Sequence, residues 1–338
     1  MLDQPLATDP LDPGAAPVPS MGPAVVRFAG DSGDGIQTLG SEFTKSSALA
    51  GHGFMTFPDF PAEIRAPAGT TFGVSAYQIQ LGGDTVRTHG DTVDVLVAFN
   101  PAALKTNLKS LRPGGLLIVD TDAFAKRGLE KAGYAENPFE DGSLDGYRVE
   151  SIEISRLTRE AAMPTGVTKK EAETARNFWA LGLVHWMFAQ DRAPTTAWLR
   201  SKFAKRPEIA EANIAALDAG HTYGDVTEFA PPTRLRSVAP AQPAPGTYRM
   251  MTGIDGMVMG LAASSALSGL GLHYCSYPIT PASAILHGLA KLGGEGVATF
   301  QAEDEIAAAT AAIGASFAGA LGVTGTSGPG MALKAEAL

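Results

Sequence analysis

Two short stretches in the last quarter of the chain hold the residues best suited to chemistry, and the first is YPITPAS at residues 277–283. Two prolines bracket Ile279 and Thr280, so this segment cannot continue as a helix or as a central strand. The pattern predicts a stiff loop that presents Thr280 and Ser283 at the end of a strand. A helix is expected to resume after Pro281, with Thr280 as its N-cap.

The second stretch, QAEDEIAA at residues 301–308, places three carboxylates ahead of an Ala-rich run. An acidic cluster suits the dipole at a helix N-terminus and often does nothing more. Successive helix residues lie about 100° apart, so at most one of the three carboxylates is expected to face a given site. Glu305 is the candidate for acid–base chemistry, because it opens a helix whose small residues let a flat ring come close. Glu303 and Asp304 are expected to serve the dipole.

A third candidate is the glycine-rich turn GDSGDG at residues 30–35. A strand, a glycine loop and a helix in this order are typical of phosphate-binding turns. However, the spacing differs from G-x-G-x-x-G, and Asp31 and Asp34 would repel a pyrophosphate. Gly33-Asp34-Gly35 matches the start of a thiamine diphosphate metal motif, but that motif needs a downstream Asn-Asn pair, which the chain lacks. A tight strand–helix turn that binds no ligand remains an alternative interpretation.

Three motifs taken together, YPITPAS, QAEDEIAA and TGTSGPGMAL (residues 324–333), resemble the 2-oxoacid:ferredoxin oxidoreductases. The match is to the alpha subunit of the 2-oxoglutarate type (2-oxoglutarate synthase), and within it to the thiamine diphosphate pyrimidine domain. It covers residues 247–338. A weaker resemblance, to the gamma domain of the same enzymes, covers residues 24–230 and includes the glycine-rich turn.

The resemblance implies an enzyme that oxidatively decarboxylates 2-oxoglutarate to succinyl-CoA on thiamine diphosphate and passes electrons to ferredoxin. It implies cofactor contacts by Tyr277, Pro278, Ile279, Thr280 and Glu305. Two of these are implied as catalytic residues, Thr280 lying against the substrate and Glu305 hydrogen-bonding the aminopyrimidine ring.

The gamma domain is associated in this family with coenzyme A and with subunit packing. The implied contacts with coenzyme A or the substrate are Thr280, Ser283, Arg65, Gly30, Gly33 and Gly35. Arg65 is included among these contacts because PAEIR at residues 61–65 matches a Pro-Glu-x-Arg stretch of similar gamma domains, with one extra alanine. A solvated loop arginine is the alternative.

The resemblance also implies partners. Mg²⁺ and [4Fe-4S] clusters are expected on a beta subunit, in an (alpha-beta)₂ hetero-oligomer that shares the thiamine diphosphate site. Cys275 is the only cysteine, too few for a cluster held by four thiolates. The alternatives are a non-catalytic assembly subunit, a branched-chain or pyruvate-type enzyme, and a nucleotide-binding oxidoreductase centred on residues 30–35.

Composition and charge narrow the range of possible partners and locations. The chain has 338 residues, of which 45% are hydrophobic, and a net charge of −9. Without a basic tract, nucleic acid and anionic membranes are poor partners. No apolar run reaches the about 18 residues of a membrane helix, and the N-terminus lacks the basic region of a secretory signal. A reducing, cytoplasmic location is expected from the single cysteine.

The elements that must position these residues form an α/β fold with two open, mostly parallel sheets and helices on both faces. The expected strands are 24–29, 73–81, 93–99, 116–119, 148–154, 270–276, 297–301 and 322–326. The expected helices are 36–50, 101–111, 177–188, 195–203, 207–220, 253–269 and 306–320.

The domain order follows from these elements. Residues 1–23 are expected to be a disordered leader, 24–230 the Rossmann-like gamma domain, 231–248 a Pro- and Ala-rich linker, and 249–338 the N-terminal part of the pyrimidine-binding domain. Only the first three strands of the last domain are expected, which favours a C-terminally truncated alpha subunit.

Overall fold

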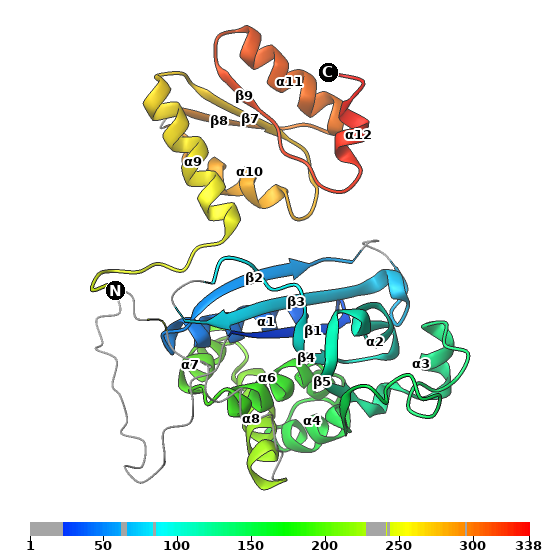
Figure 1. Cartoon of the computed structure of the whole chain (residues 1–338). Helices are drawn as coiled ribbons and strands as arrows, with labels where there is room; N and C mark the ends of the chain where they lie inside the picture. The colour runs from blue at the N-terminus through cyan, green and yellow to red at the C-terminus, as the bar shows by residue number, and fades with distance from the viewer. Residues whose placement is uncertain (1–22, 62–65, 84–85, 228–240, 242–243, 295) are drawn as a thin grey trace. The chain divides into compact units, whose positions relative to one another are not determined.

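The computed structural model describes residues 23–61, 66–83, 86–227, 241, 244–294 and 296–338. The chain divides into two compact units, Met1–Gly246 and Thr247–Leu338 (Figure 1). The predicted leader, apart from Pro23, and most of the predicted linker lie outside the described residues.

The first unit is built on a six-stranded sheet with the order β2-β3-β1-β4-β5-β6. The pairs β1–β4, β4–β5 and β5–β6 are parallel, whereas β1–β3 and β2–β3 are antiparallel. The strands are β1 Ala24–Asp31, β2 Gly53–Asp59, β3 Val74–Gly82, β4 Val93–Ala98, β5 Leu111–Asp120 and β6 Arg148–Ile152. The expected α/β class with a mostly parallel sheet is confirmed.

Strand β2 is absent from the sequence-based expectation, which starts an irregular loop at Pro58. Here Pro58 pairs opposite Tyr77 near the end of β2. The proline is tolerated because β2 is an edge strand, where a residue that lacks an N–H does not interrupt the hydrogen bonds between central strands.

Both faces of the first sheet are covered by helices, because each strand alternates apolar residues between them. Val26 and Phe28 of β1 pack with α1, α6 and α8, and Val25 and Ala29 pack on the side of α2. The helices are α1 Ile36–Leu49, α2 Pro101–Asn107, α3 Lys126–Lys131, α4 Ile154–Ala162, α5 Lys169–Glu173, α6 Arg176–Met187, α7 Ala193–Lys202 and α8 Pro207–Val226. Short 3₁₀ turns are η1 Thr71–Gly73, η2 Leu108–Ser110, η3 Thr121–Ala123 and η4 Met163–Thr165.

Helices α6 and α8 touch backbone to backbone through two glycines. A Cβ on Gly182 would lie 1.9 Å from the carbonyl oxygen of Leu217, and a Cβ on Gly220 would lie 1.8 Å from the carbonyl oxygen of Trp179.

Near this crossing, His185 of α6 is fully buried. Its ring nitrogens have no hydrogen-bond partner among the described residues, and burial lowers the pKa of His185 to about 3.

The second unit holds a three-stranded parallel sheet with the order β8-β7-β9 (Figure 1). Its core joins Leu272 and Tyr274 of β7 to Leu286 and Leu289 of a covering helix. The elements are α9 Gly253–Ser268, β7 Leu272–Ser276, α10 Ser283–Ala290, β8 Val297–Gln301, α11 Glu305–Phe317, β9 Leu321–Val323 and α12 Gly330–Lys334. Among the described residues, no helix is long and apolar enough to cross a membrane.

Candidate functional site

The three motifs of the second unit meet at one edge of its sheet. Each follows a strand, β7, β8 or β9, and parallel strands bring their carboxyl ends to the same edge, where α/β proteins bind ligands. The Tyr277 hydroxyl lies 2.6 Å from Oγ1 of Thr326, and the Ser276 hydroxyl donates to the Gly325 carbonyl at 3.3 Å. The loops after β7 and β9 are therefore tied together.

The three carboxylates of the acidic cluster differ in position and exposure, because α11 begins only at Glu305. Glu303 and Asp304 are exposed, whereas Glu305, the first residue of α11, is partly buried. Asp304 is the N-cap of α11 and accepts from the Ala307 N–H at 2.8 Å. Burial raises the pKa of Tyr277, and the neighbouring Glu305 carboxylate acts in the same direction. Glu305 is thus the carboxylate that faces the tied loops.

The YPITPAS loop differs from its expected local structure. The predicted N-cap role of Thr280 is wrong, because α10 begins at Ser283 with Ala282 at the N-cap position. The Ser283 hydroxyl accepts from the Ile279 N–H at 2.8 Å and donates to the Ile279 carbonyl at 2.9 Å. This hydroxyl therefore serves the loop itself, while Thr280 is exposed at the sheet edge. The Thr280–Pro281 peptide bond is cis.

Two further residues join this cluster: Thr326, which lies inside the third motif but has no role assigned from the sequence, and Lys334, which follows that motif. Thr326 contacts Tyr277, as described above, and Lys334 of α12 is only 2% exposed. The Lys334 ammonium donates to Oγ1 of Thr324 at 2.7 Å and to the Gly325 carbonyl at 3.0 Å. A lysine inside the otherwise apolar start of a helix, MALK, is the signal in the sequence that could have found it.

The cluster is compact, and its one carboxylate, Glu305, could bind the ring end of thiamine diphosphate. A Cβ on Gly330 would lie 2.0 Å from Oγ1 of Thr326 and 2.4 Å from the Tyr277 hydroxyl, so only glycine lets this turn close. Beside it, Glu305 opens a helix of small side chains and can share a proton with a ring nitrogen. In the part of the chain that is described, no group of three His, Cys, Asp or Glu side chains could hold a metal ion.

The glycine-rich turn of the first unit connects β1 to α1, with Gly35 left-handed at φ 72°. A Cβ on Gly35 would lie 2.5 Å from Nδ2 of Asn177. Asp34 forms an ion pair with Arg176, and its other oxygen accepts from the Asp31 N–H at 2.8 Å. The charge of Asp34, which argues against phosphate binding in the sequence, is therefore balanced by Arg176.

A cavity of about 380 Å³ opens beside this turn. Gly33 lines it, with Arg159, Lys170 and Arg176 set against Asp34, Asp122 and Glu173. Arg65, the other predicted contact, lies outside the described residues. The chain just beyond it does reach the turn, because the Gly69 N–H donates to Oδ2 of Asp31 at 2.9 Å.

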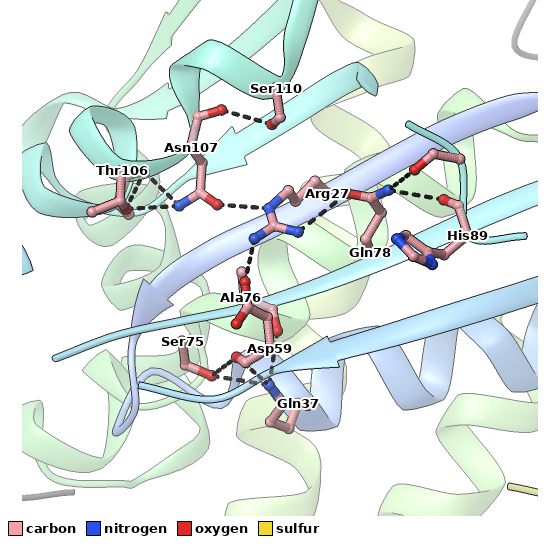
Figure 2. Close-up of polar contacts among 12 residues, drawn as sticks. Arg27, Gln37, Asp59, Ser75, Ala76, Gln78, His89, Thr106, Asn107 and Ser110 are labelled. Atoms are coloured by element: carbon pink, nitrogen blue, oxygen red, sulfur yellow. Dashed lines mark hydrogen bonds and ion pairs between the residues drawn. The ribbon is translucent and has the colours of Figure 1, made fainter. Parts of the chain in front are cut away.

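A second hollow of the first unit, about 330 Å³, surrounds Arg27. Its guanidinium donates to Asn107 at 2.6 Å, to Gln78 at 3.1 Å and to Asp59 at 2.5 Å, and Figure 2 shows these contacts. Gln78 in turn donates to the carbonyls of His89 and Gly90 at 2.8 and 2.7 Å. This network ties β1, β2 and β3 to α2, which accounts for a partly buried arginine on the sheet.

Comparison with known proteins finds a matching protein family for each of the two units. The family model "Pyruvate ferredoxin/flavodoxin oxidoreductase" matches residues 25–223, and "Pyruvate flavodoxin/ferredoxin oxidoreductase, thiamine diP-bdg" matches residues 269–338. The 2-oxoglutarate oxidoreductase subunit KorA of Mycobacterium tuberculosis is 50% identical over 314 residues, which span 93% of this chain and 48% of the relative. The 2-oxoacid:ferredoxin oxidoreductase 1 subunit alpha of Aeropyrum pernix is 27% identical over 93% of this chain and 52% of the relative.

A solved structure agrees with these matches. The 2-oxoglutarate:ferredoxin oxidoreductase from Magnetococcus marinus, with 2-oxoglutarate, coenzyme A and succinyl-CoA bound, matches with a TM-score of 0.62 and 28% identity, over 93% of this chain and 49% of that one. The chain thus spans about half the length of the proteins it matches. Because the first family model alone covers more than half of the chain, the chain belongs to the pyruvate ferredoxin/flavodoxin oxidoreductase family, and its second unit carries the family's thiamine diphosphate-binding domain.

Proposed function

We propose that the chain acts as the alpha subunit of a 2-oxoglutarate:ferredoxin oxidoreductase, which converts 2-oxoglutarate to succinyl-CoA and reduces ferredoxin. The observation that carries this proposal is the convergence of Tyr277, Glu305 and Thr326, from three separate motifs, on one sheet edge. The 50% identity to a 2-oxoglutarate oxidoreductase subunit supports the choice of substrate.

The proposed chemistry divides between cofactor and protein. Bound thiamine diphosphate supplies a carbon nucleophile that adds to the keto carbon of a 2-oxoacid. Glu305 shares a proton with a nitrogen of the aminopyrimidine ring, as a positioned acid–base group does. Exposed Thr280 lies against the substrate, and Tyr277, Pro278 and Ile279 shape the wall of the ring site. The Ser283 hydroxyl is committed to its own loop, so its proposed part is to hold Thr280 in place.

Coenzyme A is proposed to bind at the cavity beside Gly30, Gly33 and Gly35. This cavity lies at the carboxyl ends of β1 and β5, where α/β sheets take ligands. Lys170 lines it and supplies a positive charge of the kind that phosphate groups prefer. Arg65 remains a proposed further contact from the neighbouring loop.

Lys170 allows a matched test of the coenzyme A site, because the adjacent Lys169 is exposed and does not line the cavity. In the assembled enzyme, Lys170→Ala is expected to raise the KM for coenzyme A about tenfold, the loss of roughly one charge-assisted hydrogen bond. The KM for 2-oxoglutarate should not change, and Lys169→Ala should change neither. Equal behaviour of the two variants would remove this cavity from the proposal.

The remaining components are proposed to lie on other chains. Mg²⁺ and [4Fe-4S] clusters are assigned to a beta subunit, in an (alpha-beta)₂ assembly that delivers electrons to ferredoxin. Cys275 is a buried free thiol, which is consistent with the proposed cytoplasmic location.

The function is tested with the enzyme assembled from this chain and its beta subunit. We expect reduction of a viologen dye that requires thiamine diphosphate, coenzyme A and a 2-oxoacid, with the highest kcat/KM for 2-oxoglutarate. A preference for pyruvate or 2-oxoisovalerate would overturn the substrate assignment. Absence of turnover with all three acids would indicate a non-catalytic assembly subunit.

A further inference from the structure

Asp31 is an acidic residue in the glycine-rich turn that the proposed coenzyme A site does not explain. It is the last residue of β1, and a carboxylate at that position repels a phosphate group rather than binding it. The Asp34 carboxylate beside it is paired with Arg176, whereas no ion pair of Asp31 exists among the described residues. The role of Asp31 must therefore be sought in its hydrogen bonds.

The carboxylate of Asp31 holds a second turn, at residues 67–70. Within this turn the Thr70 N–H donates to the Pro67 carbonyl at 3.2 Å, and Gly69 is left-handed at φ 84°. The Gly69 N–H donates to Oδ2 of Asp31 at 2.9 Å. Because a hydrogen bond to a carboxylate is stronger than one between neutral groups, the second turn is fixed at the end of β1.

Little else holds this second turn. Among the described residues, one further hydrogen bond reaches residues 66–70 from outside the segment 66–73. It runs from the Lys131 ammonium to the Ala68 carbonyl, is 3.4 Å long and is exposed to solvent. Exposed contacts of this kind contribute little, so the bond from Gly69 to Asp31 is the main attachment.

Asp31 is itself held from the side of the cavity. Its backbone N–H donates to Oδ2 of Asp34 at 2.8 Å, and the other oxygen of Asp34 pairs with Arg176. Asp34 and Arg176 both line the cavity of about 380 Å³. A continuous series of contacts therefore leads from the cavity wall through Asp31 to the second turn.

We propose that Asp31 is a positioning residue, whose carboxylate fastens the turn of residues 67–70 to the glycine-rich turn beside the cavity. The fastened turn follows directly on Arg65 in the sequence, so the acidic residue serves the protein rather than the ligand. The consequence for coenzyme A rests on the proposed function, whereas the fastening itself does not.

The fastening is tested by amide-resolved hydrogen exchange in the assembled enzyme without coenzyme A. Asp31→Ala is expected to speed exchange of the Gly69 amide about tenfold, because that amide loses its acceptor. Asp31→Asn should keep most of the protection, because the side-chain carbonyl of Asn can still accept. Lys131→Ala is the matched control and should leave the Gly69 amide unchanged. Unchanged exchange at Gly69 in Asp31→Ala would overturn the proposal.

The pH profile of the native protein gives a second readout, which holds even where Asp31→Ala does not fold. Burial raises the pKa of Asp31 and the charge of Asp34 adds to this, whereas Asn100, which is neutral, and Arg176 lower it. As the pH falls from about 7 towards this pKa, protonation weakens the acceptor. Exchange of the Gly69 amide, corrected for its intrinsic rate, should therefore rise in the native protein and not in Asp31→Asn. Parallel profiles would overturn the role of the carboxylate.

Kinetics with coenzyme A separate the fastening from the proposed site. Asp31→Ala is expected to raise the KM for coenzyme A several-fold, with kcat and the KM for 2-oxoglutarate unchanged. If the Gly69 amide loses protection while the KM stays the same, the link between the second turn and coenzyme A is overturned and the fastening stands. If Lys170→Ala also leaves the KM unchanged, the proposed coenzyme A cavity itself fails.

Discussion

At the scale of single residues, the acidic cluster gives the sharpest comparison. Glu305→Gln should slow exchange of the C2 proton of bound cofactor by orders of magnitude, because an amide cannot share a proton with the ring nitrogen. Glu303→Gln should have little effect. Asp304→Asn should also leave exchange unchanged, since Asn is as good an N-cap as Asp. Similar losses from all three variants would remove Glu305 from its assigned role.

Asp304 then offers a separate check on the helix itself. Its carboxylate caps α11 through the Ala307 N–H, so Asp304→Ala should cost about 1 kcal/mol of unfolding free energy even though Asp304→Asn costs little.

His185 makes the stability of the first unit depend on pH. Its pKa is about 3 in the folded chain against an ordinary value of 6.5, so below pH 6.5 the unfolded chain binds a proton that the folded chain does not. The free energy of unfolding must therefore fall as the pH falls, by up to about 1.4 kcal/mol per pH unit. His185→Leu should abolish this slope between pH 6.5 and 5.5 in urea titrations. The exposed His287→Gln variant should keep it.

Local spacing in the sequence predicts some of the candidate site and misses the rest. The position of Glu305 at the start of the Ala-rich run was sufficient to separate it from Glu303 and Asp304, which precede α11. The same local logic gave Thr280 a capping role that the structure denies, because the loop turns at Ile279 and uses Ser283 instead. The lysine in MALK is unusual in the sequence, but its contact with Thr324 could not be predicted, since it depends on how α12 lies relative to the turn after β9.

At the scale of elements, the crossing of α6 and α8 is a contact that tolerates little change. A methyl group on Gly182 would meet the backbone oxygen of Leu217 at 1.9 Å, and a backbone atom cannot rotate away as a side chain can. Gly182→Ala should therefore cost more than about 3 kcal/mol of unfolding free energy or prevent folding. Gly256 of α9 has no atom within 4 Å of such a methyl, so Gly256→Ala should stabilise by up to about 1 kcal/mol. Chemical denaturation of the two variants measures both, and equal midpoints would contradict the close crossing.

The pattern of elements was largely predictable because buried strands and amphipathic helices carry strong periodic signals. Strands β4 and β5, for example, are apolar on both faces. Strand β2 was not predicted because its sequence, GFMTFPD, contains a proline and leaves Met55 and Phe57 exposed. The antiparallel direction of β3 was also not predictable, since direction depends on which neighbour a strand meets in space.

At the scale of the whole chain, the second unit exposes large apolar side chains over much of its surface. Phe317 is 96% exposed and Leu267 is 89% exposed, although both lie in helices with apolar sequences. Composition alone predicts that such residues are buried. The exposure of these two side chains is therefore a feature of the second unit that its composition does not predict.

The residues that this chain offers to the cofactor determine how it should bind thiamine diphosphate. Glu305 is the proposed partner for the ring. The described residues hold no group of three His, Cys, Asp or Glu side chains that could bind a metal ion, and the sequence lacks the Asn-Asn pair of the metal motif. A diphosphate without its metal carries a large uncompensated charge. We therefore expect isothermal calorimetry to show no magnesium-dependent binding by the chain alone at about 0.1 mM cofactor, which is about a hundred times a micromolar Kd. Binding should appear when the beta subunit is added and should be lost again in the assembly that carries Glu305→Gln. Tight magnesium-dependent binding by the isolated chain would instead place the whole cofactor site on this chain and overturn the division between subunits.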